Sequence, residues 1–101
     1  MKFQEAIQQK KPILVDFFGS HCGACQTMAP ILEILESEYR NEIQFLKINV
    51  EEHPMIAAAF QVRSVPALIL FQQGKILWRK SGLVSKKELD VLLNSTNETP
   101  D

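Results

Sequence analysis

The two cysteines of this chain, Cys22 and Cys25, are separated by two residues at a predicted strand-to-helix junction. An apolar run over residues 13–18 precedes them, and a helical pattern over residues 26–39 follows. The first turn of a helix has unpaired N–H groups and the positive end of the helix dipole, which stabilise a thiolate. An ordinary thiol of pKa ~8.5 is about 3% thiolate at pH 7, whereas one of pKa ~7 is half ionised. The pattern predicts thiol–disulfide exchange, in which Cys22 attacks a substrate disulfide and Cys25 resolves the mixed disulfide.

Other uses of the two cysteines are compatible with the residue types alone. A buried, inert pair is one alternative, although a position at the start of a helix is more typical of reactive cysteines. The side chains that could nominally form a zinc site are Cys22, Cys25, His21 and His53. His21 adjoins Cys22, however, and the usual ligand spacing is absent. A cluster shared between two subunits is a further alternative. We expect neither a metal nor a cofactor.

The composition indicates one small globular domain. Its 101 residues are 46% hydrophobic, which is enough for a single modest core. The 11 basic and 12 acidic residues give a formal net charge of -1, so no basic surface for nucleic acid is expected. No apolar run is long enough for a membrane span, and residues 1–5 lack the apolar core of a secretory signal. If this start is native, we expect a cytoplasmic protein, where a C-x-x-C pair is more often redox-active or metal-binding than structural.

Periodicity and chain breakers predict helices that alternate with strands. Helices are expected over residues 3–10, over residues 22–39, from Pro54 onward and from a capping box at residues 85–88; strands are expected over residues 13–18, 43–50, 67–71 and 76–80. This order predicts an α/β fold, with a mixed sheet and helices on both of its faces. We assign residues 1–94 to the domain and residues 95–101 to a polar tail.

The chain resembles the thioredoxin family over nearly its whole length. The matching segments, in chain order, are Val15-Asp16-Phe17, Cys-x-x-Cys at 22–25, Ala29-Pro30-Ile31-Leu32, Lys47-Ile48-Asn49, Val65-Pro66-Ala67, Phe71 with Gly74, and Gly82. A lone C-x-x-C is weak evidence, but the ordered set is specific. The resemblance implies a thioredoxin-like fold. Thioredoxins usually begin with a strand, for which this chain has no room, so we expect a four-stranded mixed sheet that lacks the usual first strand.

Asp16 is an acid in the middle of an apolar strand. Burying its charge costs several kcal/mol unless the carboxyl is paired or protonated. From its position alone, Asp16 could instead be a carboxylate that reaches the edge of the sheet. The resemblance implies an acid of raised pKa beneath Cys25 that takes and returns its proton, with Lys47 on the neighbouring strand as the counter-charge. Lys47 could alternatively be a surface lysine.

Pro66 would be trans on sequence grounds alone, since only about 5–6% of X–Pro bonds in folded proteins are cis. The resemblance implies the opposite: a cis Val65–Pro66 bond that faces the dithiol. The backbone of Val65 would then be free to pair with an extended substrate, and Gly82 would allow the substrate chain to approach. Recognition through the backbone gives broad specificity.

The residues around the dithiol differ from the family pattern. His21, Gly23 and Ala24 are expected to contact the substrate, but the family usually has tryptophan before the first cysteine and proline between the two. Phe18 stands where a second tryptophan is common. A protonated His21 would stabilise the Cys22 thiolate and make the disulfide more oxidising. Alternatively, His21 is an exposed imidazole with little effect.

Together these features predict a protein-disulfide reductase that receives electrons from an external reductase and acts on disulfide-containing proteins. An oxidant or isomerase in an oxidising compartment is one alternative, and a peptide-binding module without turnover is another. The strand at residues 43–50 would be an uncovered edge of the sheet. An uncovered apolar edge favours pairing, so we also expect a weak homodimer.

Overall fold

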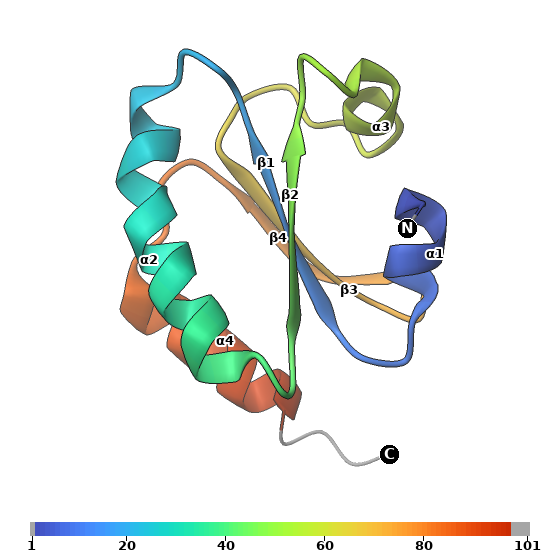
Figure 1. The fold of residues 1–101 in the computed structure, drawn as a ribbon, viewed down its shortest axis with the longest axis vertical. Coiled ribbons are helices and arrows are strands. Elements are labelled where there is room, and N and C mark those ends of the chain that lie inside the picture. The colour runs from blue at the N-terminus through green and yellow to red at the C-terminus, as the bar shows by residue number, and fades with distance from the viewer. Residues whose placement is uncertain (1, 98–101) are drawn as a thin grey trace.

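The computed structural model describes residues 2–97, in which helices and strands alternate (Figure 1). The helices are α1 (Phe3–Gln8), α2 (Gly23–Tyr39), α3 (Pro54–Ala59) and α4 (Lys86–Asn97). The strands are β1 (Ile13–Phe18), β2 (Gln44–Asn49), β3 (Ala67–Gln72) and β4 (Lys75–Ser81).

The four strands form one mixed sheet in the order β2-β1-β3-β4. Strand β1 pairs in parallel with β2 and antiparallel with β3, and β3 pairs antiparallel with β4. The predicted α/β fold class and four-stranded mixed sheet are therefore confirmed. Within residues 2–97 no strand precedes α1, so β2 lies at one edge of the sheet and β4 at the other.

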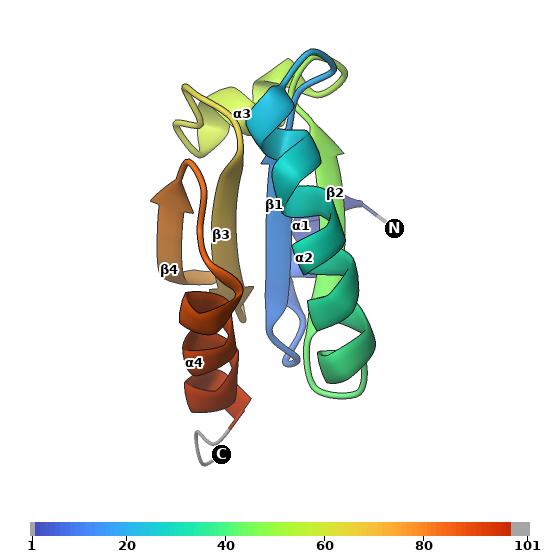
Figure 2. The same cartoon turned by 90° about the vertical axis from the view of Figure 1, so that its left-hand side faces the viewer.

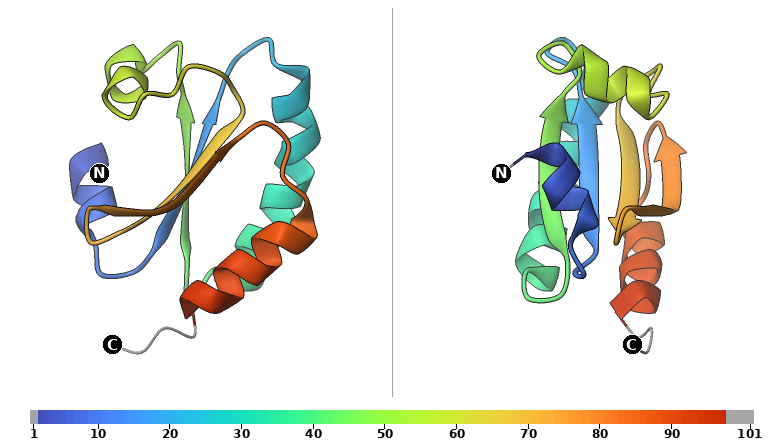
Figure 3. Two further views of the ribbon diagram at one scale, coloured as in Figure 1. Left: turned by 180° about the vertical axis from the view of Figure 1, so that it is seen from behind. Right: turned by 90° about the vertical axis from the view of Figure 1, so that its right-hand side faces the viewer.

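Helices cover both faces of the sheet, as Figure 1 shows with the sheet nearly edge-on. Helices α2 and α4 lie against one face (Figure 2), and α1 and α3 lie against the other (Figure 3). Each face has its own cluster of buried apolar side chains. Leu14 of β1 belongs to the cluster under α2 and α4, whereas Val15 and Phe17 belong to the cluster under α1 and α3. This alternation follows from the two-residue period of a strand.

The two central strands are covered on both sides. All residues of β1 and β3 are buried except the last one of each strand. The near-continuous apolar sequences of these strands suit that environment. Asp16 is the one buried charged residue that interrupts them.

The last helix begins as predicted and ends later than predicted. The Oγ atom of Ser85 accepts a hydrogen bond of 3.1 Å from the backbone N–H of Glu88, which satisfies one free donor of the first turn. The helix continues to Asn97, whereas the sequence pattern placed the start of the tail at residue 95. Residues 98–101 of the predicted tail lie outside the described residues.

Candidate active site

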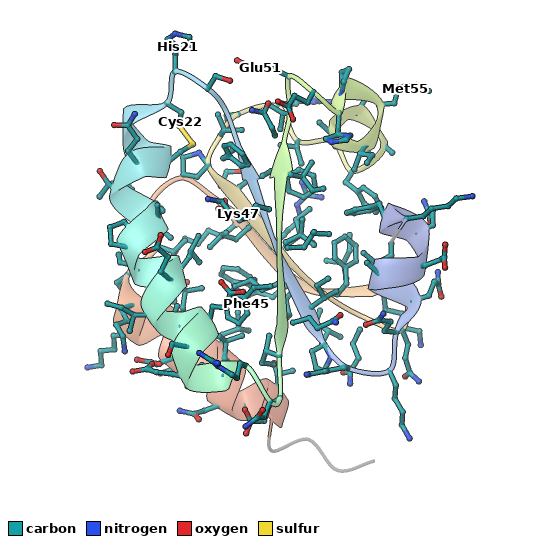
Figure 4. All side chains as sticks on the ribbon, viewed as in Figure 1. His21, Cys22, Phe45, Lys47, Glu51 and Met55 are labelled. Carbon is teal, nitrogen blue, oxygen red and sulfur yellow. A yellow bond between two sulfur atoms is a disulfide. The ribbon has the colours of Figure 1, made fainter. Side chains whose placement is uncertain are left out.

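Cys22 and Cys25 lie at the N-terminus of α2, next to the end of the sheet where β1 and β2 finish (Figure 4). Cys22 is the N-cap residue, with an extended backbone, and the helix begins at Gly23. A disulfide joins Cys22 to Cys25, and their Cα atoms are 5.2 Å apart. The backbone N–H of Cys25 donates a hydrogen bond of 3.1 Å to the Cys22 Sγ atom. In the reduced protein the same N–H would face a thiolate, which an unpaired donor in the first turn stabilises.

Asp16 lies in β1, two residues before the strand ends, and is almost completely buried. The residue is 8% exposed, and its Oδ1 atom is buried without a hydrogen-bond partner among the described residues. Burial raises the pKa of Asp16 from 3.8 to about 6, while the charge of Lys47 acts in the lowering direction. The carboxyl group is therefore able to exchange a proton near neutral pH.

Lys47 is the register partner of Asp16 across the parallel β1–β2 pair. Its side chain is exposed, and its Nζ atom lies 5.2 Å from the centre of the Phe18 ring. This is a cation–π distance. No ion pair joins Lys47 to Asp16 among the described residues, so the lysine influences the carboxyl through the electric field and not through a direct contact.

A groove connects the buried acid with the second cysteine. Asp16 and Cys25 both line it, together with Phe18 and Lys47, and its volume is about 230 Å³. The groove therefore places the carboxyl group and the resolving cysteine in one solvent-accessible space. Water that enters it can carry a proton between them.

Val65, which precedes Pro66, approaches the loop before the dithiol from another part of the chain. The Val65–Pro66 peptide bond is cis, as the resemblance implies. A Cβ atom at Gly19 would lie 3.2 Å from Val65 Cγ2 and 3.9 Å from Cys22 Cβ, so glycine allows close packing of these two segments. Gly82 has φ +89 and donates its N–H to the Pro66 carbonyl over 2.8 Å. The space where its Cβ would lie is open.

The three remaining predicted site residues surround Cys22 at the surface. His21 and Gly23 are exposed, and Ala24 is partly buried. Figure 4 shows His21 at the outer end of the loop before α2. The structure thus brings His21, Gly23 and Ala24 to the surface through which a substrate would reach Cys22.

A polar network joins the loop before α2 to the loop after β2, and sequence reasoning missed it. Asn49 Nδ2 donates to Ser20 Oγ over 3.3 Å, and the Ser20 backbone N–H donates to Glu51 Oε1 over 3.3 Å. The N–H of Glu51 donates in turn to Asn49 Oδ1 over 2.8 Å. Hydrogen bonding to Ser20 lowers the pKa of the Glu51 carboxyl. A short polar residue at or just beyond the end of each parallel strand was the available signal, because those ends meet at one edge of the sheet.

The structure does not assemble the nominal zinc ligands. No three side chains of His, Cys, Asp or Glu come together within the described part of the chain in a way that could hold a metal ion. His21 and His53 therefore do not join the two cysteines in one site. None of the described helices is both long enough and apolar enough to cross a membrane.

The fold and this site together define a class of protein that exchanges disulfides through a dithiol at the start of a helix. Residues 1–95 match the family model for thioredoxin, and the chain belongs to the thioredoxin family. It is a thiol–disulfide oxidoreductase of the thioredoxin type.

Particular relatives cover most of the chain. It is 46% identical over 79 residues to the thioredoxin-like protein slr0233 of Synechocystis sp., a match that covers 78% of this chain and 75% of the relative. It is 40% identical over 91 residues to a thioredoxin of Alicyclobacillus acidocaldarius, covering 90% of this chain and 87% of the relative. It is also 41% identical over 87 residues to a bifunctional thioredoxin reductase/thioredoxin of Mycobacterium leprae, covering 86% of this chain and 19% of that protein.

Proposed function

We propose that this chain reduces protein disulfides in the cytoplasm, with Cys22 as the nucleophile and Cys25 as the resolving thiol. The observation that carries the proposal is the placement of Cys22 Sγ at the N-cap of α2, where it accepts the N–H of Cys25. In the first step, the Cys22 thiolate attacks one sulfur of the substrate disulfide, and the other substrate sulfur leaves as a thiolate. In the second step, the Cys25 thiolate attacks Cys22 Sγ and releases the remaining substrate sulfur as a thiolate. The substrate gains two electrons, and the protein is left with the Cys22–Cys25 disulfide.

Asp16 serves the second step as the base for Cys25. Its position in the groove beside Cys25 and its pKa of about 6 support this role. Near pH 7 most of the carboxyl groups are ionised and able to accept the Cys25 proton, directly or through one water molecule. Lys47 keeps the pKa from rising further, because its positive charge favours the ionised carboxyl.

An extended substrate would bind across the face formed by Val65, Pro66 and Gly82. One feature supports this surface: the space above Gly82 is open, and the Gly82 N–H donates to the Pro66 carbonyl beside it. Pairing through backbone groups requires no particular substrate side chain, so we expect many proteins to be accepted.

An external reductase would supply the electrons, and the chain itself would need no bound cofactor. One relative is named as a bifunctional thioredoxin reductase/thioredoxin, which supports a thioredoxin reductase as the electron donor. We also infer weak self-association of this chain, because β2 is an edge strand within the described residues.

Reduction of insulin with dithiothreitol as the electron donor tests the proposed activity. The wild type should accelerate the precipitation of the insulin B chain strongly, and Cys22→Ser should not accelerate it. An equal rate with and without the wild-type protein would contradict the proposal and favour a peptide-binding module. The equilibrium potential of the Cys22–Cys25 pair distinguishes the direction of transfer: a value near that of thioredoxins, about -270 mV, supports a reductase, and one near -120 mV an oxidant.

A further inference from the structure

We propose that two copies of this chain associate through the free edge of β2, which pairs antiparallel with β2 of the second copy in a register centred on Leu46. This pairing rests on the weak self-association proposed above and specifies its strand, its register and its contacts. The result would be one continuous sheet across both copies.

The backbone of β2 has hydrogen-bonding groups that point away from the sheet. Gln44 and Val50 both donate their N–H groups toward β1, to the carbonyls of Pro12 and of the last β1 residue, over 2.9 Å in each case. Ladder groups alternate along a strand, so the even-numbered residues between them also face β1. The N–H and C=O groups of Phe45 and Lys47 consequently face the side on which no strand of the described chain lies.

The other edge of the sheet is better protected against pairing. Strand β4 has a break in its register with β3 and carries the cationic residues Lys75, Arg79 and Lys80. Charges and bulges are the features that block edge pairing. Strand β2 has an unbroken register and one cation, Lys47, whose ammonium group lies over the Phe18 ring of its own chain.

The side chains of β2 favour a register centred on Leu46 over one centred on Lys47. With the two-fold axis at Leu46, the two Leu46 side chains face each other on the side of α1 and α3, and Phe45 lies opposite Lys47 of the second copy on the side of α2. The outward backbone groups of Phe45 and Lys47 then pair with one another between copies. An axis at Lys47 would instead place two like charges directly opposite each other, which is unfavourable.

The surroundings of Phe45 favour the incoming lysine. Phe45 lines a groove together with Glu33 and Glu36 of α2. In the Leu46-centred register, Lys47 of the second copy exchanges its contact with the Phe18 ring of its own chain for a contact with this aromatic ring and these carboxylates. A cation there gains from both the ring face and the negative charges.

The antiparallel arrangement leaves both active sites open. Cys22 lies at the end of the sheet where β1 and β2 finish, and the two β2 strands would run in opposite directions. The two dithiols would therefore lie at opposite ends of the joined sheet. Association through β2 should therefore leave Cys22 of each copy accessible to substrate.

Disulfide cross-linking tests the register directly, in a background with Cys22→Ser and Cys25→Ser. Directly opposite residues of a non-hydrogen-bonded antiparallel pair have Cα atoms about 4.5 Å apart, which a disulfide can bridge. Leu46→Cys should form covalent dimers under mild oxidation at least about tenfold faster than Val91→Cys, an exposed control on α4. Phe45→Cys and Lys47→Cys should cross-link when mixed and much less when alone. The register would be overturned if Lys47→Cys alone cross-linked faster than its mixture with Phe45→Cys. It would also be overturned if Leu46→Cys cross-linked only as fast as the Val91→Cys control.

Sedimentation equilibrium of the chain with its native cysteines gives an independent measurement. Leu46→Glu should weaken dimerisation at least about tenfold because two carboxylates would face each other, whereas Leu77→Glu on β4 should not. Circular dichroism confirms that each variant is folded. A wild type that stays monomeric up to ~1 mM would overturn the pairing. Insulin reduction by the same samples separates this result from a failure of the proposed activity, since neither substitution touches the dithiol.

Discussion

Asp16 links the stability of the fold to pH. Its carboxyl has a pKa of about 6 in the folded chain and 3.8 as the ordinary value, so the folded state binds the proton more tightly. Stability is therefore highest when the carboxyl is protonated, and it falls as pH rises from about 4 through 6. This shift corresponds to about 3 kcal/mol at pH 8, as an upper estimate.

Asp16→Asn removes this cost, because the amide is neutral at every pH. We expect the variant to be more stable than the wild type by about 1–3 kcal/mol at pH 8 and nearly equal to it at pH 4. Urea unfolding of the oxidised proteins at the two pH values measures the difference. The variant should also reduce insulin severalfold more slowly. A stability difference that is the same at both pH values would show that the Asp16 carboxyl does not titrate as described.

At the residue scale, the sequence predicted the chemistry of the site more completely than it predicted the contacts between side chains. The type and spacing of Cys22 and Cys25, and the acid within an apolar strand, can be recognised without a structure. The cation–π contact between Lys47 and Phe18 cannot, because the two residues lie on different strands and the rotamer of a long side chain decides the contact. The hydrogen bonds of Ser20 likewise depend on how two loops meet.

At the scale of elements, the loop before α2 is fitted against the segment that contains the cis proline. Gly19 is the contact point, since an added Cβ would lie 3.2 Å from Val65 Cγ2. This distance is tight enough to require a small displacement of Val65, whose backbone we propose to pair with substrate. Gly19→Ala should thus lower kcat/KM for insulin about threefold to tenfold, with about 1 kcal/mol or less of destabilisation.

Parallel assays with a small disulfide, 5,5′-dithiobis(2-nitrobenzoate), serve as the control for Gly19→Ala. This reagent reports on the Cys22 thiolate but makes no extended backbone pairing. Its rate of reduction should change less than that of insulin. Equal losses for both substrates would indicate that Gly19 affects Cys22 itself and not the segment with Val65.

The elements themselves were predicted closely where hydrophobic periodicity is strong, and less closely at their ends. Strands β1 and β3 are buried on both faces, so their apolar runs match the observed bounds to within a residue. Helix α4 continues to Asn97, although its last residues are polar. Once a helix is packed along one face, further turns can continue into solvent without any apolar pattern to mark them.

At the scale of the whole molecule, the sheet combines a closed centre with an open edge. Strands β1 and β3 separate the two apolar clusters and are paired on both sides, whereas β2 is paired only with β1. Amides in the centre can exchange with solvent only when the whole domain unfolds, and those at the edge can exchange through local opening. Hydrogen exchange should therefore be slowest in β1 and β3.

Within β2, exchange should alternate from residue to residue. The amides of Leu46 and Ile48 face β1 and should exchange at least about tenfold more slowly than those of Phe45 and Lys47, which face outward. Two-dimensional NMR of a dilute sample, followed after transfer to D₂O, resolves the four amides. Raising the protein concentration should slow exchange at Phe45 and Lys47 selectively, because pairing between copies engages those two groups. Equal protection of all four amides at low concentration would mean that the outer edge of β2 is already covered within a single chain.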